Sequence, residues 1–172
     1  MSPAYRPPEL LAEHHELSEF RCRSGEQTDW LRRYARQSSS TGTTRVFVVT
    51  GEDGHRVVAY YAWCMAQLRA DQAPERLRRG AGRYPQPVAL LARLGVDVDH
   101  EGRGLGAGLL RDVFARLVEM PDDIGCRGLL VHAESREARE FYLHLVPGFE
   151  QSPTDELHLV ALTKDIRGTL RG

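Results

Sequence analysis

The sequence is poor in cysteine and in long apolar runs, and each shortage excludes a class of protein. Its three cysteines, Cys22, Cys64 and Cys126, are odd in number and far apart. We therefore expect neither a disulfide framework nor a zinc site, and no metal is predicted. No segment approaches the roughly 18 consecutive apolar residues of a membrane helix, and the first residues lack a basic region followed by an apolar one. We expect a cytoplasmic protein without a membrane partner.

Lysine is almost absent, because Lys164 is the only lysine and nearly every basic residue is arginine. The arginines cluster in residues 68–84, which carry only Asp71 and Glu75 as acids. The basic side chains there are Arg69, Arg76, Arg78, Arg79 and Arg83. Guanidinium groups suit phosphate oxygens, so this stretch predicts contact with a polyanion. A solvated surface that binds nothing is an equal alternative at this stage.

The 172 residues fit one compact domain, predicted over 1–172. Apolar periodicity and turn residues predict alternating helices and strands, an α/β class. The expected elements are a helix over 26–37, a hairpin over 45–68 around Gly51–Gly54, a strand over 87–98, a helix over 105–118, a strand over 127–133, a helix over 135–145 and a last strand over 157–163.

A glycine-rich loop, "VDVDHEGRGLGAGLL" over 96–110, lies between an expected strand and an expected helix. Backbone N–H groups and the positive end of a helix dipole converge at such a turn, so the loop predicts an anion site. "GRGLGA" fits the weak form of the dinucleotide fingerprint, but it lies past mid-chain, behind two strands that look antiparallel. No Gly-Lys-Ser/Thr follows, which argues against a nucleotide P-loop.

The order of motifs resembles the GNAT family, the Gcn5-related N-acetyltransferases. Glu101-x-x-Gly104-x-Gly106 matches the family pattern except at Glu101, where Gln or Arg is usual, and Arg103-x-x-Gly106-x-Gly108 also fits. A helix containing Phe141-Tyr142 and a "PGF" segment follow. The resemblance implies the acyl-CoA N-acyltransferase fold, a central mixed and mostly antiparallel sheet flanked by helices, with acetyl-CoA as cofactor.

A narrower resemblance, to the toxin branch of that family (TacT, AtaT and their relatives), covers most of the chain. Its blocks are "FRCRSGEQTDWL", "RVFVV", "VVAYYAW", "PVALLARLGVD", "GCRGLLVHA", "AREFY" and "GF". The resemblance implies acetylation of the α-amino group of aminoacyl-tRNA, which blocks translation. It also implies a ribbon-helix-helix antitoxin, a homodimer, and a repressor role in which DNA is bound only through the antitoxin complex.

The resemblance also implies roles for single residues. The strand before the loop pairs with the pantetheine arm, the N–H near Val96 serves as oxyanion donor, and the loop holds the pyrophosphate. The implied cofactor-binding residues are Leu94, Gly95, Val96, Val98, Arg103, Gly104, Leu105, Gly106, Ala107, Gly108 and Ser135. With tRNA as the substrate, the expected tRNA contacts are Arg76, Arg78, Arg79 and Arg83, while Arg93 faces the acceptor or pairs with a buried acid.

Tyr142 is the candidate general acid, since a phenol with a pKa of roughly 10 is protonated at neutral pH and can protonate a leaving thiolate. A core tyrosine beside Phe141 is the alternative. No base is evident, although His132 and Glu134 could relay a proton through water. An α-amine, with a pKa of about 7.7 to 8.0, needs less help than a lysine side chain. An acetyltransferase for small amines or protein N-termini and a degenerate binding partner remain the alternative functions.

Overall fold

The computed structural model describes residues 4–79, 82–120 and 123–171. The chain divides into two compact units, one of residues 1–64 and 92–112 and the other of residues 65–91 and 113–172. The prediction of a single domain over 1–172 is untested by this division and stays a prediction. Among the described residues, no helix is long and apolar enough to cross a membrane.

The described strands follow the order β1-β2-β3-β4-β5-β7-β6. Their bounds are β1 Glu9–Leu10, β2 Arg45–Thr50, β3 Val57–Leu68, β4 Gln86–Val96, β5 Gly128–His132, β6 Glu150–Gln151 and β7 His158–Leu162. β4 and β5 pair in parallel, whereas β1–β2, β2–β3, β5–β7 and β6–β7 are antiparallel. The predicted mixed, mostly antiparallel sheet is confirmed.

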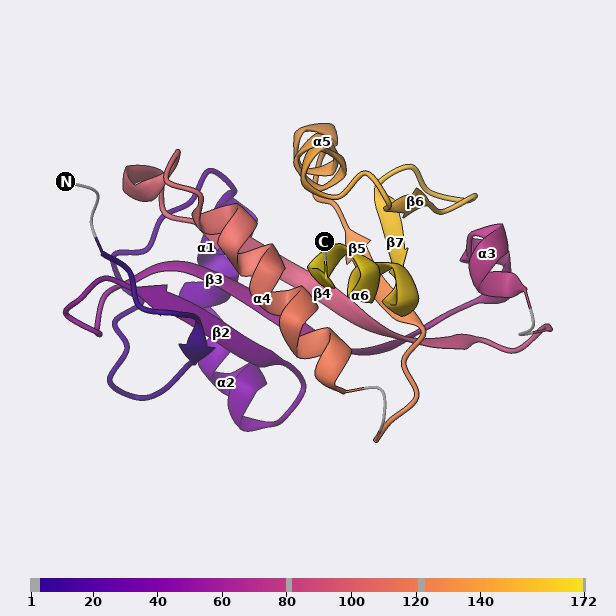
Figure 1. Cartoon of the computed structure of the whole chain (residues 1–172). Helices are drawn as coiled ribbons and strands as arrows, with labels where there is room; N and C mark the ends of the chain where they lie inside the picture. Colours follow the sequence, from indigo (N-terminus) through magenta and orange to yellow (C-terminus); the bar gives the residue numbers. More distant parts are fainter. Residues whose placement is uncertain (1–3, 80–81, 121–122, 172) are drawn as a thin grey trace. The chain divides into compact units, whose positions relative to one another are not determined.

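In the first unit, helices α1 (Gly25–Arg33) and α2 (Ala35–Ser40) accompany the β2–β3 hairpin (Figure 1). Leu31 and Ala35 are fully buried against strand residues such as Val46 and Tyr60. The expected single helix over 26–37 is wrong, because the chain forms two helices that meet at Tyr34. The Tyr34 side chain is exposed, and its N–H donates to the Trp30 carbonyl at 2.8 Å and so caps α1. The predicted hairpin is confirmed, with Gly54 at φ 74° in its turn.

The first unit also contains the 3-10 turn η2 (Val98–His100) and the start of helix α4 (Leu105–Glu119). α4 buries Leu109, Val113 and Leu117, the helical spacing expected from the sequence. Asp97 begins η2, and its carboxylate accepts the Asp99 N–H at 2.9 Å. The chain therefore leaves β4, makes one tight turn and enters the glycine loop in a fixed geometry.

The second unit contains η1 (Ala70–Gln72), α3 (Glu75–Arg78), α5 (Arg136–Leu145) and α6 (Thr163–Arg171). Its core includes Leu77, Val88, Leu130 and Val160. The expectation that a strand closes the chain is wrong, because α6 follows β7 directly. Ile166 is the buried anchor of that helix. Gly168 lowers the helix propensity of this segment, so the sequence does not clearly predict a helix there.

Candidate active site

The glycine loop adopts a backbone that favours glycine. Gly102 and Gly104 have φ values of 74° and 80°, in the left-handed region that other residues avoid. A Cβ atom added at either position would meet no atom within 4 Å. The glycines are therefore required by conformation, and the space before them is open. That combination fits a phosphate group resting on the loop.

The first turn of α4 supplies backbone donors. The N–H groups of residues 105–107 have no intrahelical acceptor, as in any helix start, and they lie at the positive end of the dipole. The Gly108 N–H instead donates to the Gly104 carbonyl at 3.0 Å. This N–H therefore closes the first helical turn, and the expectation that Gly108 binds the pyrophosphate stays a prediction.

The predicted pantetheine-binding edge lies at the end of β4. Leu94 and Val96 are half-buried, and Gly95 is buried. A Cβ at Gly95 would lie 3.2 Å from Tyr60 Cε1 and 3.3 Å from Cys22 Sγ, so the core packs closely against this glycine, and its predicted contact with the cofactor stays a prediction. The Val98 N–H donates to the Arg21 carbonyl at 2.9 Å, and the predicted cofactor contact of Val98 stays a prediction.

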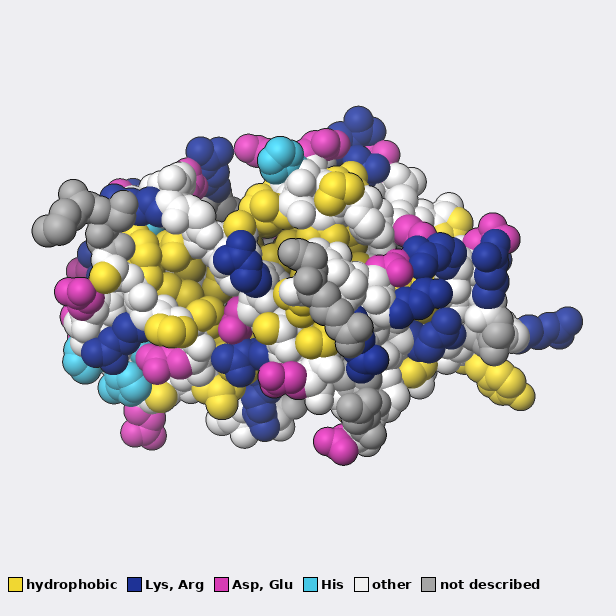
Figure 2. Space-filling model, viewed as in Figure 1, with side chains coloured by type: hydrophobic (Ala, Val, Ile, Leu, Met, Phe, Trp, Pro, Cys, Tyr) yellow, Lys and Arg dark blue, Asp and Glu magenta, His cyan; other side chains and the backbone are white. Residues whose placement is uncertain are grey.

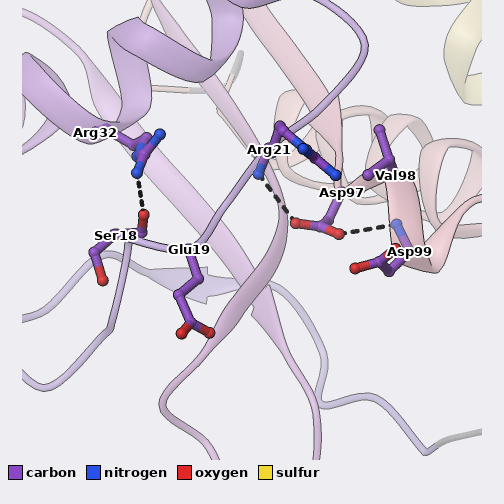
Figure 3. A pocket seen from close by; sticks show the side chains of 7 residues that line it. All are labelled: Ser18, Glu19, Arg21, Arg32, Asp97, Val98 and Asp99. Carbon is purple, nitrogen blue, oxygen red and sulfur yellow. Dashed lines mark hydrogen bonds between the residues drawn. The ribbon is translucent and has the colours of Figure 1, made fainter.

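A pocket of about 280 Å³ lies beside this turn, lined by Ser18, Glu19, Arg21, Arg32, Asp97, Val98 and Asp99 (Figure 3). Asp97 is buried and accepts hydrogen bonds from the backbone N–H groups of Arg21 and Asp99. Arg32 donates to the Ser18 carbonyl. Asp97 and Arg32 thus bind backbone groups of the pocket wall, and the Asp97 bonds join the segment before α1 to the end of β4.

Two arginines lie at the glycine loop. Arg103, predicted from the motif, is exposed and donates to the Tyr5 hydroxyl at 2.9 Å, which in turn bonds His100 Nδ1 at 2.8 Å. Arg23, which the sequence analysis missed, directs its Nε to both carboxylate oxygens of Glu101 at 2.9 and 3.1 Å. The departure of Glu101 from the family pattern was the signal that could have found it.

Tyr142 lies on α5, which begins with Ser135 as N-cap. The Ser135 Oγ accepts the Ala138 N–H at 3.1 Å. Ser135, which is also a predicted cofactor contact, therefore caps the start of α5. The Tyr142 ring is buried in contact with Phe141 and Phe149, with ring centroids 5.2 and 6.2 Å away. Burial, and next the negative charge of Glu134, raise the pKa of the phenol well above its usual value. The hydroxyl keeps its proton at neutral pH, as a general acid must.

His132 stacks on His158 across β5 and β7, with ring centroids 3.8 Å apart. His158 Nε2 lies 3.4 Å from Asp155 Oδ2. Burial, followed by the neighbouring His158, lowers the pKa of His132, so the imidazole is neutral at physiological pH. A neutral imidazole can accept a proton, which keeps His132 a candidate relay.

The arginine-rich stretch is firmly docked in the second unit. Leu77 is fully buried, Arg127 donates to the Leu77 carbonyl at 3.2 Å, and the buried Ser152 hydroxyl donates to the Gln72 carbonyl at 2.7 Å. Figure 2 shows basic side chains gathered over α3 with acidic side chains among them. A four-residue helix held at several points presents its exposed side chains in a fixed arrangement.

The structure divides these arginines into two kinds. Arg76 donates to both oxygens of Asp165 at 2.7 and 3.1 Å and to Glu150 at 3.2 Å. This pairing holds the pKa of Asp165 below its usual value. Arg78 and Arg83 are exposed, and the exposed Arg79 makes a long contact of 3.4 Å with Glu75. The Arg76 guanidinium is thus already satisfied by carboxylates, unlike the arrangement expected for a phosphate contact.

Arg93 pairs with Glu26, which is an exposed acid and not the buried acid of the prediction. Its Nη1 lies 3.0 Å from Glu26 Oε1 and 3.3 Å from Gln27 Oε1, and its guanidinium lies 5.5 Å from the Trp30 ring centroid. The Glu26 side chain is exposed. The pair therefore lies at the surface of the first unit, where β4 meets α1.

A cluster of potential metal ligands, Glu9, His14 and His15, occurs among the described residues. His15 Nδ1 accepts the Ala12 N–H at 2.9 Å, so a neutral imidazole carries its proton on Nε2 and donates it to Glu9 at 2.8 Å. Neither ring nitrogen then offers a lone pair to a cation. The cluster is a hydrogen-bonded histidine–carboxylate pair, and the prediction of no metal stays a prediction.

Comparison with known proteins places this geometry in a family. The model of the Acetyltransferase (GNAT) family matches residues 11–145. The tRNA-acetylating toxin of Mycobacterium tuberculosis (strain ATCC 25618 / H37Rv) is 43% identical over 166 residues, 96% of this chain and 97% of that protein.

Solved structures share the fold at lower identity. AtaT complexed with acetyl-methionyl-tRNAfMet has a TM-score of 0.86 at 22% identity, covering 96% of this chain and 99% of that chain. A mutant AtaT toxin bound to the C-terminus of the antitoxin AtaR and acetyl-CoA has a TM-score of 0.81 at 22% identity, covering 98% and 99%. With a glycine loop at the start of α4 and a mixed sheet of this order, the chain belongs to the Acetyltransferase (GNAT) family.

Proposed function

We propose that this protein is a toxin that transfers an acetyl group from acetyl-CoA to the α-amino group of an aminoacyl-tRNA and so blocks translation. The observation that carries the proposal is the 43% identity, over 96% of the chain, to a protein named as a tRNA-acetylating toxin. The left-handed glycines before α4 support it, because they provide an anion site suited to a coenzyme.

Bound acetyl-CoA would supply the activated thioester. The N–H groups of residues 105–107 and the side chain of Arg103 bind phosphate oxygens, and the end of β4 at Leu94–Val96 orients the pantetheine arm. The Val96 N–H is the donor for the oxygen that becomes negative. Gly104 and Gly106 let the backbone approach the phosphates without a side chain.

Tyr142 holds the proton that the departing sulfur needs. Its raised pKa keeps the phenol neutral before the step, and transfer of that proton to sulfur accompanies cleavage of the carbon–sulfur bond. The incoming amine forms the new carbon–nitrogen bond and releases its own proton to water, with neutral His132 as the candidate relay. Solvent then returns a proton to Tyr142.

Arg78, Arg79 and Arg83 contact tRNA phosphates, and Arg76 positions them. Arg76 joins α3 to α6 and β6 through Asp165 and Glu150, so its guanidinium fixes the segment that carries the exposed arginines. Such contacts hold the polyanion in register and do not touch the thioester.

The partner of the toxin is a ribbon-helix-helix antitoxin, the active form is a cytoplasmic homodimer, and DNA is bound only by the toxin–antitoxin complex. The solved structure of AtaT bound to the C-terminus of the antitoxin AtaR supports the proposal that this protein has an antitoxin partner. Light scattering of the purified chain tests the dimer. Co-purification with the product of the neighbouring gene tests the antitoxin.

Mass spectrometry of total tRNA after incubation with acetyl-CoA tests the function. Wild type should add one acetyl group to an aminoacyl-tRNA, and Tyr142→Phe should slow this by roughly 10² to 10⁴, the span for loss of a general acid. Tyr34→Phe, the same chemical change at an exposed tyrosine, should leave turnover unchanged. Acetylation of a small amine or a peptide N-terminus without tRNA acetylation would contradict the proposal.

A further inference from the structure

The segment that precedes β1 continues the pairing of β1 with β2 (Figure 1). The Arg6 N–H donates to the Thr50 carbonyl at 2.9 Å, and Tyr5 forms an antiparallel bridge with Gly51. Arg6 Nη2 also donates to the Glu52 carbonyl in the hairpin turn at 3.1 Å. Backbone and side-chain bonds to the β2–β3 hairpin therefore fix the position of Tyr5 in the first unit.

The Tyr5 side chain reaches the entrance of the glycine loop, 95 positions further along the chain. Its hydroxyl oxygen lies 2.8 Å from His100 Nδ1, and the two rings meet edge to face with centroids 5.7 Å apart. Arg103 Nη1 donates to the same hydroxyl at 2.9 Å and lies 3.3 Å from His100 Nδ1. A guanidinium only donates, so the Tyr5 oxygen accepts from Arg103. The phenol thus links the N-terminal segment to both residues.

Arg103 lies between Gly102 and Gly104, whose φ values of 74° and 80° are left-handed. The Arg103 side chain is exposed, and an exposed arginine samples many rotamers unless a contact restrains it. The Tyr5 hydroxyl is such a restraint. Within the part of the chain that the structure describes, no carboxylate forms an ion pair with Arg103. A neutral phenol orients the guanidinium and leaves its positive charge in place, whereas an acidic partner would cancel that charge.

We propose that Tyr5 is a positioning residue for coenzyme binding, because its hydroxyl holds the Arg103 guanidinium in place for a phosphate of acetyl-CoA. The hydrogen bond orders Arg103 before the coenzyme arrives, so less side-chain entropy is lost on binding. The inference rests on the proposed use of acetyl-CoA and on the proposed contact of Arg103 with phosphate.

Calorimetric dissociation constants for acetyl-CoA and for S-acetylpantetheine, which lacks the phosphates, test the proposal. Tyr5→Phe keeps the ring beside His100 and removes the hydroxyl. It should weaken acetyl-CoA binding about 3- to 10-fold, as for loss of one hydrogen bond, and leave S-acetylpantetheine binding unchanged. Tyr34→Phe, the same chemical change at an exposed tyrosine, should bind both compounds like wild type.

A double-mutant cycle shows whether Tyr5 acts through Arg103. Arg103→Ala should weaken acetyl-CoA binding. Adding Tyr5→Phe to that variant should cause no further loss, because the side chain that Tyr5 positions is then absent. A full further loss in the double variant overturns the inference, and so does unchanged affinity in Arg103→Ala.

Each other outcome has a distinct meaning. Unchanged acetyl-CoA affinity in Tyr5→Phe overturns the inference and leaves the proposed function intact. Equal losses for acetyl-CoA and S-acetylpantetheine also overturn it, because they show an effect on the fold of the loop. Absence of acetyl-CoA binding by wild type overturns the proposed function, and this inference with it.

Discussion

Replacing Arg76 by alanine should weaken tRNA binding without changing how steeply that binding depends on salt. The Arg76 guanidinium lies 2.7 Å from Asp165 and 3.2 Å from Glu150, so its charge is already balanced within the protein. It therefore displaces no counterion from tRNA. Its loss loosens α3 and disturbs the arrangement of the arginines that do contact phosphates.

The expected magnitudes separate the two roles. An arginine that contacts one phosphate contributes about 0.7 to 0.9 to the slope of log K against log salt concentration, so Arg78→Ala and Arg83→Ala should each make the slope shallower by that amount. Arg76→Ala should change the slope by close to zero. The Arg76 and Asp165 side chains are 39% and 37% exposed, so solvent screens the pair and its effect on folding stability should be small.

The assay is tRNA affinity at several salt concentrations for wild type and the single variants, with melting temperature as the check on folding. Arg78→Lys is the matched control, because lysine keeps the charge and should keep the slope. A slope change in Arg76→Ala equal to that in Arg78→Ala would refute the division of roles. Unchanged slopes in both Arg78→Ala and Arg83→Ala would refute the docking surface itself.

Three further predictions concern the loop, β4 and Tyr142. Acetyl-CoA should raise the melting temperature of wild type by mass action but not that of Gly104→Val, because φ at Gly104 is 80°. The control variant Gly125→Ala should be stabilised by acetyl-CoA like wild type. Stabilisation of Gly104→Val by acetyl-CoA would contradict the phosphate role of the loop. Gly95→Ala should lower the free energy of unfolding, measured by urea denaturation, by about 1 to 3 kcal/mol, because its Cβ would lie 3.2 Å from Tyr60 and 3.4 Å from Phe20. An unchanged urea midpoint would show that these two rings move aside without cost. Because the pKa of Tyr142 is raised in the folded state, its contribution to stability is present below pH 10 and is lost above it. The difference in unfolding free energy between wild type and Tyr142→Phe should therefore fall by up to about 1.4 kcal/mol per pH unit above about pH 10, and a constant difference from pH 7 to 11 would count against the burial of the phenol.

Local sequence determined the elements that position the site. The apolar spacing of α4 placed Leu109, Val113 and Leu117 inside, and all three are buried. Gly51–Gly54 marked the β2–β3 turn, and the glycines at 102 and 104 marked the loop whose φ values only glycine adopts readily. These features depend on periodicity and backbone conformation, which neighbouring residues fix among themselves.

The sequence was weaker where an element lacks its own pattern. Tyr34 follows the helical spacing of Trp30 and Leu31, yet it ends α1 in an exposed position, because the chain turns there into α2. Among the side chains that the structure describes in α6, Ile166 is the buried apolar one, within a polar segment, so tertiary packing and not periodicity stabilises the helix.

Only the tertiary structure decided how the charges are paired. Arg76 and Asp165 are 89 positions apart, and Arg23 and Glu101 are 78 apart, so no local pattern relates them. From sequence, Arg76 looked like its neighbours Arg78 and Arg79, and Glu101 looked like a departure without a reason. A charged side chain takes its role from the partner that folding brings within about 3 Å, whereas a turn or a helix face takes its form from the residues beside it.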